Sequence, residues 1–281
     1  MNYNDQLEQL IIIALKEDIG DGDHSTLSSI DGYAQGKAVL KIKEPGLLAG
    51  MAVAEKIFQF IEPASMFTAF KKDGDAMIAG QTAFEISARV HTILQTERLV
   101  LNIMQRMSGI ATLTKTYTDK LKGYHTKLLD TRKTTPGFRL LEKEAVRIGG
   151  GINHRFGLYD MIMLKDNHID YCGGIEKAIN KAYAYTQTNK PGLQIEVETR
   201  NLEEVKIVMA VGKVNRIMLD NFTPALIEDA LKIIGKRYKT EASGGININN
   251  IEAYAATGVD YVSCGAVIHQ ARSLDLSLKA V

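Results

Sequence analysis

The stretch LQIEVETRNLEEVKIVMAVGKVNRIMLDNF (193–222) decides the fold, because it holds two β-rich runs separated by a helical pattern. The first run is LQIEVET (193–199) and the second is RIMLDN (216–221). A strand, a helix and a second strand in this order are typical of a parallel sheet whose helices cover the strands. Each run also carries an acid near its end, Glu198 in the first and Asp220 in the second.

The same rhythm runs through the chain after residue 125. Four further runs have this character: KLLDTRK (127–133), DMIMLKDNHI (160–169), KTEASGG (239–245) and VDYVSCGA (259–266). Polar or glycine residues gather where the six runs end, namely Arg132, Lys133, Lys165, Glu198, Asp220, Ser243 and Gly265. In parallel α/β barrels this end of the strands forms the active-site face. Six contributing strands favour a barrel or partly open barrel over a doubly wound sheet, which gathers its site at one switch point.

Residues 1–110 have a different pattern, which predicts a small α+β domain. GKAVLKIKEPGLLAG (36–50) reads as a strand running into a turn, MAVAEKIFQFI (51–61) as a helix, and 71–90 as a hairpin or strand pair with a turn at Asp73-Gly74. Residues 96–123 predict a long helix with Thr96 as its N-cap, leading into the second domain.

The composition excludes several classes of function. A formal net charge of +1 shows no basic excess, so neither nucleic acid nor a membrane surface is an expected partner. No apolar run is long enough to span a membrane, and the short run 10–15 belongs to an amphipathic helix, not a signal peptide. Cys172 and Cys264 have neither disulfide-framework nor zinc-site spacing, which fits a reducing cytoplasm; whether either thiol matters is not encoded in its context.

Six cations lie in polar, turn-like contexts or on helix faces: Arg98, Arg132, Lys133, Arg139, Arg155 and Lys165. A single surface cation is usually solvated and without function. The pair Arg132-Lys133 at a predicted strand end is harder to dismiss, because substrates with carboxylates and phosphates need several positive donors.

The segment around His154-Arg155 follows three consecutive glycines, 149–151. It reads equally well as a flexible loop with a surface histidine or as a loop whose backbone approaches an anion, with two donors at its end. Both interpretations stay open at this point.

The acids Glu196 and Glu198 share one face of their predicted strand, since side chains alternate with period two. Interior carboxylates are costly unless they are paired or bind a metal. Glu198 and Asp220 could therefore hold Mg²⁺ or ribose hydroxyls, or they could simply pair with nearby cations.

Two glycine signals follow the last two predicted strands, Ser243-Gly244-Gly245 and Gly265-Ala266. Barrels often bind phosphate at these loops through backbone N–H groups and a helix N-terminus. His269 lies four residues beyond Gly265, where it could reach that phosphate or only pack.

Over nearly its full length the chain resembles the quinolinate phosphoribosyltransferases (nicotinate-nucleotide pyrophosphorylase, carboxylating). The motifs that carry the resemblance, in chain order, are EDIGDGD (17–23), TERLVLNIMQRMSGIAT (96–112), DTRKTTPGFR (130–139), GGGINHRFGLYDMIMLKDNH (149–168), IEVE (195–198), MLDNF (218–222), EASGGI (241–246) and SCGAVIH (263–269).

The resemblance implies an α/β fold with an N-terminal α/β sandwich (residues 1–110) and a C-terminal open α/β barrel (residues 111–281). The last few residues are expected to pack back on the first domain. It also implies a homodimer or higher homo-oligomer with shared sites.

The resemblance further assigns roles to individual residues. It implies that Arg98 of the partner subunit helps to bind quinolinate. The positions that match those gripping the quinolinate carboxylates are Arg132, Lys133, His154, Arg155 and Lys165, and Thr131 belongs to the substrate-binding set. Glu198 and Asp220 match positions contacting the sugar and Mg²⁺. The phosphate cradle matches Ser243, Gly244, Gly245, Gly265 and His269. The catalytic set is Lys133, Lys165, Glu198 and Asp220.

The implied activity transfers phosphoribosyl from phosphoribosyl pyrophosphate to quinolinate with loss of CO2, giving nicotinate mononucleotide for NAD biosynthesis. Mg²⁺ is the expected cofactor, and no organic cofactor is needed. Two alternatives remain: a molybdenum-transport-associated paralogue with the same fold, and a non-catalytic sugar-phosphate binding protein. The second would need the phosphate cradle but not the cations at 132, 133, 155 and 165.

Overall fold

The computed structural model describes residues 2–281, which form two compact units. Unit 1 comprises residues 2–115, 134–150 and 267–281, and unit 2 comprises residues 116–133 and 151–266. The units are therefore not two consecutive stretches of chain, because a helix after the first parallel strand and the C-terminal strand both belong with unit 1.

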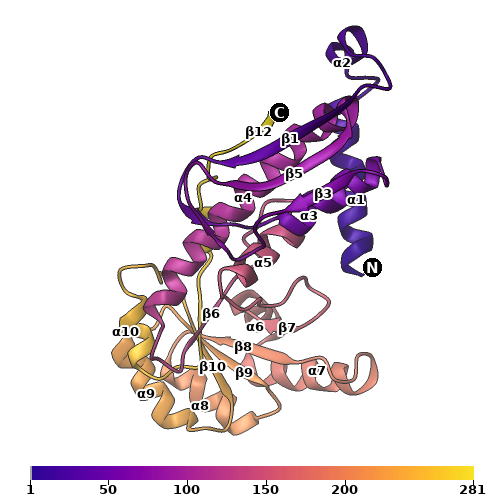
Figure 1. Ribbon diagram of the computed structural model, residues 1–281. Helices are drawn as coiled ribbons and strands as arrows, with labels where there is room; N and C mark the ends of the chain where they lie inside the picture. The colour runs from indigo at the N-terminus through magenta and orange to yellow at the C-terminus, as the bar shows by residue number, and fades with distance from the viewer. Residues whose placement is uncertain (1) are drawn as a thin grey trace. The chain divides into compact units, whose positions relative to one another are not determined.

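Unit 1 is built on a four-stranded antiparallel sheet in the order β12-β1-β5-β3 (Figure 1). Its strands are β1 (Gln35–Ile42), β3 (Met66–Ala69), β5 (Thr82–Arg89) and β12 (Leu276–Ala280), with a separate pair β2 (Gly46–Leu47) and β4 (Ala76–Met77). Its helices are α1 (Tyr3–Ile19), α2 (His24–Ser29), α3 (Met51–Ile61), α5 (Arg139–Ile148) and most of α4 (Val90–Lys120).

An aromatic cluster fills the space between α3 and this sheet. Phe58 of α3 lies 6.1 Å from the ring of Phe84 on β5, and Phe67 of β3 lies 4.5 Å from the same ring. Phe58 and Phe84 are fully buried, so this contact removes large apolar surfaces from water and holds the helix on the sheet.

Unit 2 is a six-stranded parallel sheet in the order β6-β11-β10-β9-β8-β7. The strands are β6 (Lys127–Leu129), β7 (Ile162–Leu164), β8 (Ile195–Thr199), β9 (Arg216–Asp220), β10 (Lys239–Ser243) and β11 (Tyr261–Ser263). The helices are α6 (Asp166–Cys172), α7 (Ile175–Thr188), α8 (Leu202–Val211), α9 (Pro224–Ile234), α10 (Ile251–Ala256) and the start of α11 (Ala266–His269). In Figure 1, α7, α8, α9 and α10 lie on the outer side of the strands.

The expected fold class is confirmed, because an antiparallel α/β unit accompanies a parallel α/β unit. All six β-rich runs predicted after residue 125 contain a strand of this sheet. The sheet has two edge strands, β6 and β7, as an open barrel requires. Within residues 2–281, no helix is both long and apolar enough to cross a membrane.

Two local predictions were wrong. Thr96 does not cap a helix, because α4 begins at Val90 and the buried Thr96 hydroxyl donates to the carbonyl of Thr92 one turn earlier. The turn expected at Asp73-Gly74 is present, but the hairpin that contains it pairs β3 with β5, so its first strand lies before residue 71 and not within 71–90. The turn at Asp73 also caps α3. The carboxylate of Asp73 accepts the backbone N–H of Met51 at 2.8 Å, at a helix start where Gly50 has no side chain to make this bond.

Candidate active site

The carboxyl ends of the parallel strands bring most of the predicted site residues in unit 2 to one edge of the sheet. Lys165 follows β7 directly, Glu198 is the penultimate residue of β8, and Asp220 and Ser243 end β9 and β10. The register pairs Ser243 with Asp220, and Leu164 with Val197, so Lys165 comes beside Glu198. The Lys165 ammonium nitrogen lies 3.6 Å from Glu198 Oε2.

Negative charge accumulates at this edge. Burial raises the pKa of Glu198, and the charges of Asp220 and Asp166 raise it further, while Lys165 opposes both. Burial also raises the pKa of Asp220, against the effects of Lys165 and Ser243. Both carboxyl groups are therefore held in surroundings that disfavour their charge, which a cation placed between them would relieve.

Positive charge accumulates on the neighbouring loops. Arg132 and Lys133 are exposed directly after β6, where the Lys133 backbone N–H donates to the Thr131 hydroxyl at 3.0 Å. Burial lowers the pKa of Arg155, and the charge of Arg132 lowers it further. Two guanidinium groups that repel each other in this way form a natural site for an anion with more than one carboxylate.

The glycine pair after β10 adopts a backbone that an ordinary side chain would strain. Gly244 has φ +92° and Gly245 has φ +63°. A Cβ on Gly244 would lie 2.2 Å from Asn221 Oδ1, so the backbone here fits tightly against the residue after Asp220. Gly265 is half-buried between β11 and α11. Together these loops present backbone close to the strand ends, as a phosphate site requires.

The loop at His154-Arg155 is pinned inside unit 2 and is not a free surface segment. The backbone N–H of His154 donates to Asp130, and a guanidinium nitrogen of Arg155 donates to the carbonyl of Met161 at 3.1 Å. The next two backbone N–H groups donate to the carboxylate of Asp160. The interpretation as a flexible loop is therefore wrong for His154, whose side chain is only 5% exposed.

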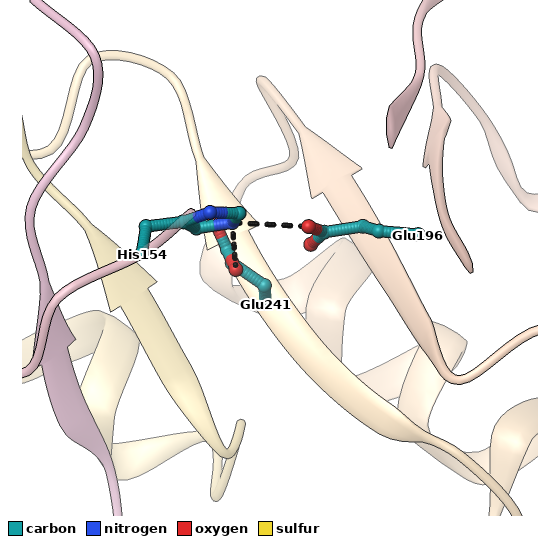
Figure 2. Close-up of side chains that lie close together, drawn as sticks. All are labelled: His154, Glu196 and Glu241. Atoms are coloured by element: carbon teal, nitrogen blue, oxygen red, sulfur yellow. Dashed lines mark ion pairs between the residues drawn. The ribbon is translucent and has the colours of Figure 1, made fainter. Parts of the chain in front are cut away.

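The imidazole of His154 points into the barrel, between two buried carboxylates (Figure 2). Its Nε2 lies 3.0 Å from Glu196 Oε2 and 3.3 Å from Glu241 Oε2. Arg216 completes the cluster, with a guanidinium nitrogen 2.7 Å from Glu241 and 3.9 Å from Glu196. We call His154, Glu196, Arg216 and Glu241 the inner cluster.

The protonation of the inner cluster follows from this geometry. Burial lowers the pKa of His154, but its interactions with Glu196 and Glu241 outweigh burial and raise that pKa to about 9. The backbone nitrogen of Arg155 donates to Nδ1 at 2.6 Å. This bond needs a lone pair on Nδ1, so it favours a ring that carries one proton, on Nε2. In either state Nε2 carries a proton toward the two carboxylates. Burial, aided by the charge of Glu241, raises the pKa of Glu196 to about 7.

Sequence reasoning had singled out Glu196 but missed Arg216 and Glu241. The signal lay in the period-two alternation of the strands. Arg216 shares a strand face with Asp220, Glu196 shares one with Glu198, and Glu241 shares one with Ser243. The inner cluster is thus the layer of side chains next to the rim, displaced toward the amino ends of the strands.

Two predicted site residues, Arg98 and His269, belong to unit 1. Arg98 is exposed on α4, and His269 is exposed at the end of α11. Arg139, also in unit 1, donates from Nε to the Thr134 hydroxyl at 2.9 Å. The rim therefore brings together the acids, the glycines and the cations of unit 2, while the roles of Arg98 and His269 stay predictions.

The sequence matches two family domains that together span most of the chain. "Quinolinate phosphoribosyl transferase, N-terminal domain" matches residues 23–108, and "Quinolinate phosphoribosyl transferase, C-terminal domain" matches residues 110–279. The chain belongs to the quinolinate phosphoribosyltransferase family.

Relatives within the family are similar over nearly the whole chain. The tobacco protein named quinolinate phosphoribosyltransferase [decarboxylating] 1b is 42% identical, across 97% of this chain and 82% of its own. A Bacillus subtilis protein named probable nicotinate-nucleotide pyrophosphorylase [carboxylating] is also 42% identical, across 97% and 93%. The crystal structure of NadC from Streptococcus pyogenes superposes with a TM-score of 0.90 at 41% identity, covering 98% of this chain and 97% of that one.

A divalent cation is the cofactor that the resemblance implies, and the carboxylates at the rim are of the type that could hold one. Glu198 and Asp220 supply hard carboxylate oxygens, the ligand type that Mg²⁺ prefers, and both carboxyl groups have raised pKa values that a cation would offset. Two carboxylates are too few for a complete octahedral shell, so substrate oxygens and water would supply the rest.

Proposed function

We propose that this protein transfers the phosphoribosyl group of phosphoribosyl pyrophosphate to quinolinate and releases pyrophosphate and CO2. The observation that carries the proposal is the division of charge at one strand edge: cations that repel each other at Arg132 and Arg155, and carboxylates with raised pKa values at Glu198 and Asp220. The first set fits an aromatic dicarboxylate, and the second fits a metal-bound sugar pyrophosphate.

Quinolinate is a dianion with adjacent carboxylates, and each needs its own donors. Arg132 and Arg155 offer bidentate guanidinium groups, and Lys133 and Lys165 offer point charges. Arg155 is already buried in the protein. A carboxylate that binds it therefore has little water to displace from the guanidinium. By the family resemblance Arg98 of the partner subunit adds a further guanidinium, and we therefore propose a homodimer or higher oligomer with shared sites.

The sugar pyrophosphate would occupy the other half of the rim. Ser243, Gly244, Gly245 and Gly265 form a backbone cradle for the 5′-phosphate, and His269 is the remaining candidate donor. Glu198 and Asp220 would hold the ribose side of the substrate and Mg²⁺. When bound, the metal neutralises the pyrophosphate leaving group.

The reaction then needs little covalent chemistry from the protein. The pyridine nitrogen forms a bond to ribose C1 as the bond from C1 to pyrophosphate breaks, and nearby carboxylate charge stabilises the cationic character of C1. The new pyridinium withdraws electrons from C2. The C2 carboxylate leaves as CO2, the bonding pair stays on the ring, and C2 takes up a proton. Lys165 and Lys133 orient the ring through its carboxylates.

The decisive experiment measures pyrophosphate release with quinolinate and, separately, with nicotinate. We expect turnover with quinolinate, with nicotinate mononucleotide and CO2 as products. Nicotinate lacks the C2 carboxylate and would pair less completely with the buried Arg155 guanidinium, and an incompletely paired buried charge typically costs several kcal/mol. Comparable use of nicotinate would reject the substrate. Absence of any quinolinate-dependent release would favour a non-catalytic binding protein, and the family comparisons give that alternative no support.

Glu198→Ala and Asp220→Ala test the metal assignment. Each variant should raise the KM for phosphoribosyl pyrophosphate far more than the KM for quinolinate, because carboxylates do not attract an anionic acid. Full activity in the presence of a chelator would reject Mg²⁺ as the cofactor.

The place of action in the cell is also a proposal. Cys172 and Cys264 are not joined in a disulfide, an arrangement that suits a reducing compartment, and we propose the cytoplasm. Some plant relatives are named chloroplastic or mitochondrial, so the family is not confined to one compartment.

A further inference from the structure

The inner cluster lies one side-chain layer away from the rim and is buried. Glu196 and Glu241 have side chains with no exposed surface, and the side chain of Arg216 is 14% exposed. Isolated buried charges are costly, so four of them in one place must be balanced. With His154 and Arg216 as cations the cluster is neutral; with a singly protonated His154 it is neutral once Glu196 holds a proton.

A metal ion is the first alternative for such a group. His154, Glu196 and Glu241 have possible ligand atoms within 4.8 Å of one another. Among the described residues they form a group of side chains that could hold a metal ion. The Arg216 guanidinium, however, lies 2.7 Å from the Glu241 oxygen that also faces His154, and it stacks on the Tyr261 ring at 4.5 Å. Because Arg216 already balances one of the two carboxylates, a divalent ion would leave the buried group with a net positive charge.

The second alternative is direct contact between His154 and substrate, as the family resemblance implies. The ring nitrogens are oriented differently here. Nε2 faces Glu196 and Glu241, and Nδ1 faces the backbone N–H of Arg155. In this orientation the imidazole links the inner cluster to Arg155, the buried cation whose pKa is lowered by burial and by Arg132.

We propose that Glu196, Glu241 and Arg216 act as positioning residues: they hold the ring of His154, which in turn fixes the backbone of Arg155 and aims its guanidinium at quinolinate. This inference rests on the proposed function. Asp130, Asp160 and the Met161 carbonyl also bond to this loop, through three backbone N–H groups and one guanidinium nitrogen of Arg155, and the inner cluster adds a constraint that acts through the imidazole ring. A displaced Arg155 would weaken the grip on one carboxylate and leave the phosphoribosyl side unaffected.

Glu196→Gln and Glu241→Gln remove one charge each and keep the shape. We expect quinolinate, titrated alone by calorimetry, to bind roughly tenfold more weakly in each variant, and its KM to rise by a similar factor. The KM for phosphoribosyl pyrophosphate should stay within about twofold. A purely structural role would instead lower kcat and change both KM values together.

Asp260→Asn is the matched control. Asp260 is also a barrel carboxylate with several hydrogen bonds, to Lys239, Thr240 and His125. It lies just before β11, at the amino ends of the strands and so at the end of the sheet opposite the rim. This variant should lower thermal stability and leave both KM values unchanged.

A double-mutant cycle tests the route through His154. If Glu241 acts through the ring, His154→Gln combined with Glu241→Gln should bind quinolinate no more weakly than His154→Gln alone. If the double variant instead loses quinolinate affinity by the product of the two single-variant factors, Glu241 acts independently of His154 and the inference is overturned. If either glutamine variant fails to fold, the aspartate at the same position keeps the charge, and the same selective loss of quinolinate affinity is expected.

Other outcomes separate the inference from the proposed function. A wild-type protein without quinolinate-dependent turnover would reject the function itself. An active wild type whose Glu196 and Glu241 variants bind quinolinate normally would reject only the positioning role. A stoichiometric transition metal in the purified protein, lost in Glu241→Gln, would also overturn it.

Discussion

Replacing Gly244 by alanine should damage the phosphate cradle in a way that replacing Gly245 does not. Both glycines have a positive φ, so an alanine at either position carries backbone strain of about 1 kcal/mol. The surroundings differ. A Cβ on Gly245 meets nothing within 4 Å, whereas a Cβ on Gly244 lies 2.2 Å from Oδ1, 2.7 Å from Cγ and 2.9 Å from the backbone nitrogen of Asn221.

The clash at Gly244 reaches the rim through Asn221. Its backbone N–H donates to the carbonyl of Ser243 at 2.8 Å, and its side-chain amide donates to Asp220 Oδ2 at 2.6 Å. Asn221 itself has φ +58°, so it has little freedom to yield. Losing these contacts adds about 1–2 kcal/mol, which gives a total of about 2–3 kcal/mol for Gly244→Ala against about 1 kcal/mol for Gly245→Ala.

Urea unfolding and steady-state kinetics measure the two consequences. Gly244→Ala should unfold at a lower urea concentration than Gly245→Ala, and its KM for phosphoribosyl pyrophosphate should rise about tenfold, because Asp220 and Ser243 both shift. The KM for quinolinate should change much less. Equal stability of the two variants, or equal effects on both substrates, would refute the reasoning.

Three further outcomes are expected. Burial raises the pKa of Asp260, but Lys239 and His125 outweigh burial and depress that pKa to about 2, below the ordinary 3.8. The ionised Asp260 carboxylate therefore stabilises the folded protein fully above roughly pH 5, and this stabilisation is lost as the pH falls toward 2. Urea unfolding of Asp260→Asn should therefore show a deficit of about 1 kcal/mol at pH 6, discounted for solvent screening, that falls to about half by pH 3; a constant deficit would contradict the assignment. Gly109→Ala should destabilise unit 1 by more than about 3 kcal/mol in thermal unfolding, because its Cβ would lie 1.8 Å from the carbonyl oxygen of Arg272, and a near-normal Tm would show that the backbone can separate. Arg98→Ala and Lys165→Ala should each be nearly inactive, yet co-refolding should recover roughly a quarter of the sites if each site uses both chains; no recovery despite mixed dimers would reject shared sites.

The rim could be predicted because its residues obey local rules. Each β-rich run ends in a polar or glycine residue, and parallel strands bring such ends to one edge whatever the details of packing. That is why Lys165, Glu198, Asp220 and Ser243 were found from spacing alone. The family motifs then supplied the chemistry that spacing could not.

The helix start at Val90 could not be read from the chain in the same way. Thr96 is a good N-cap in isolation, but residues 90–95 continue the helix because Ile93 and Thr96 are buried in unit 1. The tertiary gain from burying that first turn outweighs the local preference of a threonine hydroxyl. The Asp73 turn shows the same effect, since its carboxylate is used by a helix 22 positions earlier in the chain.

By itself the sequence determined the two kinds of α/β unit, the polar residues at which the parallel strands end, and the family. These depend on period-two and helical periodicities and on short motifs, which are properties of neighbouring residues. Only the tertiary structure decided the inner cluster. Glu196, Arg216 and Glu241 come from three strands and His154 from a loop. Their ionic contacts, at 2.7–3.9 Å, depend on distance in space and not on separation along the chain. Which charged groups surround each buried glutamate is therefore decided by the packing of strands that are distant in the sequence.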